Sequence, residues 1–149
     1  MKNVNVKLPD DPLNGSSIEE LGSKLRNGLI TCFELTQIYY KRINILNSQL
    51  HAYIYLNEEK ALSWADGIDK LMNCGVDLGP LMGIPIAIKD ICAVEGMPTT
   101  NGSQIISDDI TGPEGSLVKR LKLLCCIILG KTHTVDSVSY THLRAHETP

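Results

Sequence analysis

Two short apolar runs, separated by a long loop and a helix, constrain the fold of this 149-residue chain more than any other feature. The first is "IPIAI" at 84–88, and the second, "CCIIL" at 125–129, ends at Gly130. Short apolar runs without polar alternation are typical of strands that are buried on both faces. A strand, a crossover with a helix and a second strand form a parallel pair with a right-handed connection. The pattern therefore predicts an α/β fold.

The segment before the first run is predicted to form a helical N-terminal block. Capping residues and apolar positions at helical spacing recur along it. In the crossover, a helix that begins near Glu114 is expected to bury Leu117, Leu121 and Leu124. The expected N-terminal elements are a helix from Ser17 to about Gly28, a helix opened by the T-x-x-E capping box at 31–34, a strand over 51–56 and a helix capped by Asn57 that runs to about Cys74.

Composition excludes several classes of function. The net charge of −3 provides no basic field for nucleic acid. The N-terminal segment lacks the apolar core of a secretory signal, and the apolar run at 123–129 is too short to span a bilayer. The five cysteines form no C-x-x-C pair, as expected for reduced, structural thiols. We therefore expect a soluble, cytoplasmic protein with no membrane partner.

Two local motifs suggest ligand sites that their context does not support. "GKT" at 130–132 would belong to a phosphate loop only if residue 125 were glycine, but this residue is Cys125 and the segment between them is strand-like. His142 and His146 have the spacing of a metal-binding helix face, but no third ligand accompanies them. The sequence therefore predicts neither a metal nor a cofactor.

Lys89 directly follows the first apolar run, with no polar residue leading up to it. In one interpretation its stem lies along apolar surface while its amine reaches water or pairs with Asp90 or Glu95. In the other, the amine lies in a dry pocket, where burial disfavours the charged ammonium and a lysine can act as a general base. The residues alone leave both interpretations open.

Three motifs resemble the N-terminal third of amidase signature enzymes in order and spacing: "GPLMGIPIAIKD", "GMPTTNGS" and "IILGKTHTVD". The resemblance covers residues 79–136 and implies a mixed sheet covered by helices. It also implies amide hydrolysis by a serine–serine–lysine triad, in which Lys89 takes a proton from a bridging serine held by a cis peptide and that serine activates the nucleophile. The positions that it implies as pocket-lining or supporting are Asp90, Thr99, Thr100, Gly102 and Ser103.

The chain departs from the family pattern in three respects. The motifs that carry the two triad serines are absent, so no residue of this chain matches the nucleophile and the chain by itself is expected to be inactive. After Asp136 the resemblance ends, which predicts a truncated amidase domain over 1–136 and a tail unrelated to the family over 137–149. Cys125 also stands where the family often has a glycine that closes a helix.

Three functions stay open on the sequence. The first is that the parent protein hydrolyses a small-molecule carboxamide, with no cofactor and no direct contact to nucleic acid. The second is a component of a transfer-RNA-dependent amidotransferase, which would need partner chains. The third is a short, non-catalytic scaffold that binds a partner. The oligomeric state is not predicted.

Overall fold

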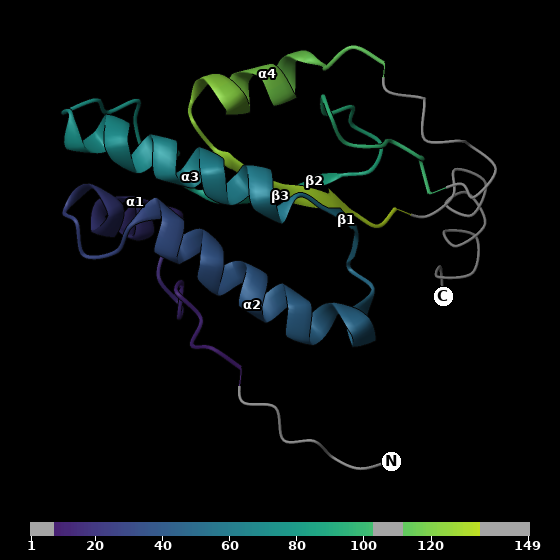
Figure 1. Ribbon diagram of the computed structural model, residues 1–149, viewed down its shortest axis with the longest axis horizontal. Coiled ribbons are helices and arrows are strands. Elements are labelled where there is room, and N and C mark those ends of the chain that lie inside the picture. Colours follow the sequence, from purple (N-terminus) through teal and green to yellow (C-terminus); the bar gives the residue numbers. More distant parts are fainter. Residues whose placement is uncertain (1–7, 103–111, 135–149) are drawn as a thin grey trace, which may run out of the picture.

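The computed structural model describes residues 8–102 and 112–134, which form four helices and three strands. Their order confirms the predicted helical block followed by a β-loop-α-β unit (Figure 1). The predicted boundary at 136 and the pair His142 and His146 lie outside the described residues. The elements are α1 (Ile18–Arg26), α2 (Cys32–Leu50), β1 (Tyr53–Leu56), α3 (Glu58–Asn73), β2 (Pro85–Lys89), α4 (Ser116–Leu123) and β3 (Ile127–Thr132).

The first two helices begin at complete capping boxes. The sequence predicts the box at Thr31, and for the first helix it predicts capping by serine. Ser17 pairs reciprocally with Glu20 at the start of α1, and Thr31 does so with Glu34 at the start of α2. For α3 the sequence predicts the position of the N-cap residue correctly but not its capping hydrogen bond. Asn57 occupies the N-cap, but its side chain makes no capping hydrogen bond, because its backbone (φ −128°, ψ 56°) lies outside the extended region that capping side chains need.

The three strands form one mixed sheet in the order β1-β3-β2. β2 pairs with β3 in parallel, as predicted, and β1 pairs with β3 in antiparallel orientation. The parallel register places Lys89 opposite Thr132, with an irregularity between Ile86 and Ala87. β3 is therefore the central strand and β2 lies at an edge of the described sheet.

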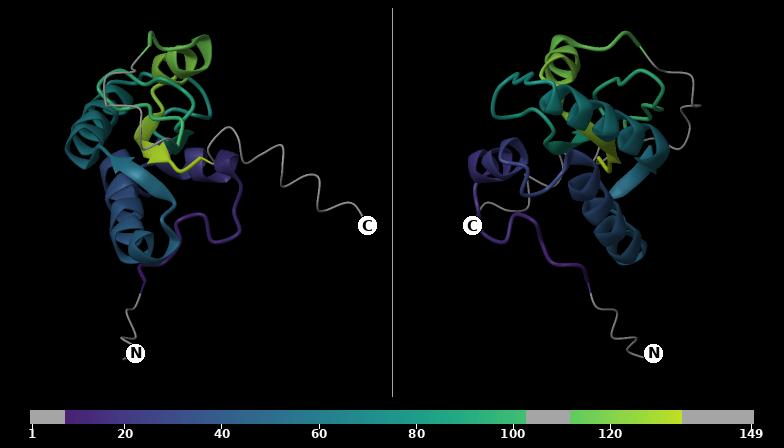
Figure 2. Two further views of the ribbon diagram at one scale, coloured as in Figure 1. Left: turned by 90° about the vertical axis from the view of Figure 1, so that its right-hand side faces the viewer. Right: turned by 60° about the vertical axis from the view of Figure 1, so that its left-hand side comes forward.

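Two apolar clusters lie on opposite sides of this sheet. Ile127 and Leu129 of β3 contribute to the larger cluster, together with residues of α1, α2 and α3. Ile128 of β3 joins Ile88 and Val118 of α4 in the smaller one. This alternation follows from the pleat of a strand. Figure 1 and both views of Figure 2 show α4 and α2 on opposite sides of the strands.

Two burial predictions were wrong. β2 was expected to be buried on both faces, but Ala87 and Lys89 are exposed, because β2 has a described neighbour on one side only. Along α4 the buried residue is Val118, whereas Leu117 is 59% exposed and Leu124 is 37% exposed. The helix turns Val118, with the half-buried Leu121, toward the sheet, so neighbouring leucines on the same short helix face outward.

The turn after α4 accommodates Cys125 where the family often has glycine. Cys125 adopts the left-handed conformation (φ +54°). Its N–H donates to the Lys122 carbonyl, and the Cys126 N–H donates to the Leu121 carbonyl, both at 3.0 Å. These are the two hydrogen bonds of a Schellman motif, so the helix ends as it would with glycine.

Candidate functional site

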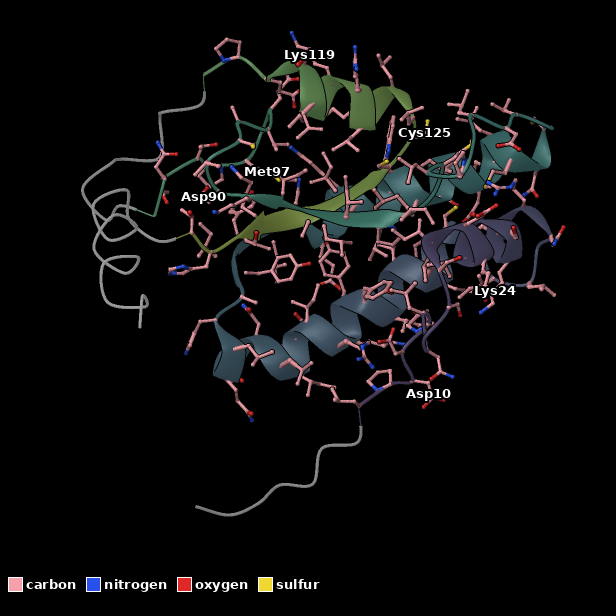
Figure 3. The ribbon with its side chains drawn as sticks, turned by 180° about the vertical axis from the view of Figure 1, so that it is seen from behind. Asp10, Lys24, Asp90, Met97, Lys119 and Cys125 are labelled. Carbon is pink, nitrogen blue, oxygen red and sulfur yellow. The ribbon has the colours of Figure 1, made fainter. Side chains whose placement is uncertain are left out.

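The carboxyl ends of β2 and β3 bring the predicted site residues to one end of the sheet. Lys89 ends β2 opposite Thr132, and the N–H of Asp90 donates to the Thr132 carbonyl at 3.1 Å. Figure 3 shows Asp90 and Met97 at this end of the strands and Cys125 at the opposite end. In α/β sheets, ligands bind at the carboxyl ends of parallel strands.

Lys89 is exposed at this end of the sheet. Among the residues that the structure describes, no hydrogen bond or ion pair engages its ammonium. Ala87 shares its side of the strand and is exposed as well. The dry environment that a general base requires is therefore not supplied by the described part of the chain.

Asp90 points the other way and is fully buried. Its Oδ2 accepts hydrogen bonds from Thr100 through both the main-chain N–H (3.1 Å) and the hydroxyl (2.5 Å), and from the Gly102 N–H (3.4 Å). Its own carbonyl accepts from the Asn101 N–H at 3.2 Å. The loop that follows β2 is thus wrapped around one carboxylate.

The partner of this carboxylate is Lys131, which is also fully buried. Its Nζ lies 3.2 Å from Asp90 Oδ1 and donates to the hydroxyl of Thr99 at 2.8 Å and to the carbonyl of Pro98 at 3.1 Å. The three protons of the ammonium therefore face three acceptors. Asp90 Oδ1 makes no hydrogen bond of standard geometry among the described residues, and its polar contact there is the ion pair with the Lys131 ammonium.

Opposing effects set the pKa of the Asp90 carboxyl. Burial raises this pKa, but the hydrogen bonds from Thr100 and Gly102 and the contact with the Lys131 ammonium lower it by more, so the carboxyl pKa lies below its ordinary value. Asp90 is therefore ionised at neutral pH, and Lys131 balances its charge inside the protein.

The structure thus gathers four of the predicted supporting residues in one loop. Asp90, Thr99, Thr100 and Gly102 all take part in this network, and Ser103 lies outside the described residues. Sequence reasoning missed Lys131, because "GKT" was examined only as a phosphate loop. The signal that could have found it is the predicted parallel pair, since a lysine stands at or close to the carboxyl end of each strand.

A cavity of about 630 Å³ opens elsewhere, between α3 and α4. Its lining includes the apolar side chains of Trp64, Val94, Met97 and Ile128, with Lys60 and Lys119 among the charged ones. Lys89 does not line this cavity. The cavity is therefore not part of the site at the strand ends.

The described residues form neither a metal site nor a membrane-spanning helix. Across 8–102 and 112–134, no three His, Cys, Asp or Glu side chains come together in a way that could hold a metal ion. In the same ranges, no helix combines the length and the apolar character that crossing a membrane requires.

Comparison with known proteins identifies relatives of the chain. A model of the family described as Amidase matches residues 34–142. The glutamyl-tRNA(Gln) amidotransferase of Streptomyces coelicolor has a subunit that is 38% identical over 114 residues, which are 76% of this chain and 23% of the relative. The crystal structure of native peptide amidase from Stenotrophomonas maltophilia superposes with a TM-score of 0.78 and 31% identity, over 84% of this chain and 26% of that one.

A third structure agrees in fold. A bacterial aryl acylamidase described as belonging to the amidase signature enzymes has a TM-score of 0.75 at 22% identity, over 83% of this chain and 26% of that one. The chain therefore spans about a quarter of the length of the relatives it matches.

Proposed function

Because the chain belongs to the amidase signature family, we propose that it forms the N-terminal portion of an enzyme that hydrolyses a small carboxamide, with Lys89 as the general base. The observation that carries this proposal is the placement of Lys89. It stands at the carboxyl end of a parallel strand, and no described residue engages its ammonium.

The chemistry follows from what an unprotonated amine can do. Lys89 accepts a proton from a bridging serine, which accepts the proton of a second serine as that serine attacks the amide carbonyl. The tetrahedral intermediate expels the amine of the substrate, which leaves with a proton. Water then releases the carboxylic acid from the acyl-enzyme. Both serines would come from parts of the enzyme beyond this chain, so we expect the 149 residues alone to lack this activity.

The exposed side of β2 supports this arrangement. Ala87 and Lys89 lie on the exposed side of the strand, and the outer edge of β2 has no strand beside it among the described residues. In an enzyme of the relatives' length, the remaining three quarters could cover this surface and so remove water from the Lys89 amine. Desolvation disfavours the charged ammonium and favours the base.

The test is the Lys89→Met variant in the full-length enzyme that contains this segment. Methionine keeps much of the side-chain volume and removes the base, so kcat/KM should fall by on the order of 10²–10⁴-fold. The matched control is Lys41→Met, which changes an exposed lysine on α2 and should leave kcat/KM unaltered. Full activity of the Lys89→Met enzyme would refute the role of Lys89 as the general base.

The substrate class has one further candidate, because the Streptomyces coelicolor relative is part of a glutamyl-tRNA(Gln) amidotransferase. A subunit of that kind would need partner chains for its activity. Hydrolysis of simple amides by the purified full-length enzyme, without added partner chains, would favour the stand-alone enzyme, which we place in the cytoplasm. Activity that requires added partner chains would favour the amidotransferase.

A further inference from the structure

Lys131 and Asp90 form a fully buried ion pair beside Lys89, and the proposed mechanism assigns neither of them a role. The pair joins three segments of the chain. Asp90 directly follows β2, Lys131 belongs to β3, and the ammonium also binds Pro98 and Thr99 in the intervening loop. Burying two charges is costly unless they are paired and hydrogen-bonded, which this network achieves.

The pleat of β2 connects this pair to Lys89. The Asp90 N–H continues the ladder to Thr132, so the alternation of sides extends one residue beyond the strand. Ile88 and Asp90 face inward and are buried, whereas Ala87 and Lys89 face outward and are exposed. A shift of one residue in register would turn Asp90 outward and Lys89 inward.

The backbone ladder alone defines this register weakly. The pairing of β2 with β3 is already irregular between Ile86 and Ala87, three residues before Lys89 ends the strand. A second constraint is therefore needed at the carboxyl end. The ion pair provides it, because Asp90 Oδ1 and the ammonium of Lys131 lie 3.2 Å apart in the observed register and a slip of one residue would turn Asp90 to the other side of the strand.

We propose that Lys131 is a positioning residue for Lys89: through Asp90 it locks the carboxyl end of β2 in register and so directs the Lys89 amine to the opposite side of the strand. This inference rests on the proposed function, because it gives Lys131 a catalytic consequence only if Lys89 is the base. The GKT motif thereby gains a role that involves no nucleotide.

The test uses the full-length enzyme that contains this segment. Lys131→Met alone would leave the Asp90 carboxylate buried without its counter-charge, so the double variant Lys131→Met/Asp90→Asn, which removes both charges, is the main probe. The matched control is Lys70→Met/Asp66→Asn, which makes the same two changes in an exposed ion pair on α3. The measurements are kcat and KM separately, and amide hydrogen exchange at individual residues.

We expect the double variant to lower kcat by about 10- to 100-fold with KM nearly unchanged, because a small displacement of a catalytic group acts on the chemical step. Exchange of the Asp90 and Thr100 amides should accelerate at least about tenfold, while the amides in the middle of α2 stay as protected as before. The control variant should change neither kcat nor these exchange rates.

Three outcomes separate the two ideas. Wild-type kcat in the double variant, with kcat lost in Lys89→Met, would overturn the positioning role alone. A general rise in exchange that includes α2 would also overturn it, since the pair would then support overall stability rather than the strand end. Wild-type kcat in Lys89→Met would refute the proposed function. The Lys131 variants test only the positioning role, so none of their outcomes can refute the proposed function.

Discussion

Replacing Gly83 with alanine should destabilise the protein far more than the same change at Gly75. Gly83 precedes β2 with a φ of +79°, and a Cβ at this position would overlap the sulfur of Cys32 and lie 3.3 Å from Leu25 Cδ1. Gly75 has nearly the same φ, +84°, but its Cβ would meet nothing within 4 Å. Comparing the two alanine variants therefore separates the cost of backbone strain, which both positions share, from the cost of overpacking, which arises only at Gly83.

The expected magnitudes follow from these two effects. An alanine in the left-handed region costs about 1–2 kcal/mol at either position. At Gly83 the fully buried Cys32 leaves no space for the added methyl group, and overpacking of a core adds about 1–3 kcal/mol. Gly83→Ala should thus lower the free energy of unfolding by roughly 2–5 kcal/mol, and Gly75→Ala by about 1–2 kcal/mol.

Urea unfolding monitored by circular dichroism measures this difference, provided that the m-value stays constant among the variants. The double variant Gly83→Ala/Cys32→Ala removes the sulfur that causes the overlap. It should recover about 1–2 kcal/mol relative to the sum of the single changes. Equal losses at Gly83 and Gly75, or a double variant that is strictly additive, would refute the reasoning from overpacking.

Two further predictions concern buried polar groups. The folded protein holds the pKa of Asp90 below its ordinary value of 3.8, so the ionised carboxylate stabilises the fold at pH values above 3.8. This stabilisation is lost as the pH falls below 3.8 and through the folded pKa, so the urea midpoint should decrease in this acidic range. Asp90→Asn should make the urea midpoint depend less on pH there; an unchanged pH dependence would contradict the lowered pKa of Asp90. Tyr40→Phe removes a buried hydrogen bond of 2.6 Å to the Leu129 carbonyl, which keeps its bond from the Asn57 N–H. The expected loss is about 1 kcal/mol in urea unfolding, and an equally stable variant would show that the hydroxyl contributes nothing.

The local elements were the part of the fold that sequence reasoning predicted best. The serine cap at Ser17, the capping box at Thr31 and the strand, predicted over 51–56 and observed at 53–56, depend on residues within a few positions of each other. Even the parallel pairing could be predicted, because a strand–helix–strand crossover restricts the topology. The family motifs added the candidate role of Lys89, which no periodicity could supply.

Errors arose where burial depended on the neighbours of an element. The apolar run of β2 reads like a central strand, but β3 occupies the centre of the described sheet because β1, from far upstream, pairs with its other edge. The apolar residues of α4 fit a helical pattern on more than one face of the helix. The position of the sheet relative to the helix decides that Val118 is the residue buried against it. Neither choice is encoded in a window of neighbouring residues.

The sequence by itself determined where helices begin, which runs form strands and which family the motifs resemble, because these depend on short-range sterics, hydrogen bonds and motif spacing. The tertiary structure alone decided which lysine is buried. Each strand of the parallel pair carries a lysine at or next to its carboxyl end, yet register and pleat turn Lys131 inward onto Asp90 and leave Lys89 exposed. The energy of a buried charge depends on its distance to a counter-charge, and that distance exists only once the chain has folded.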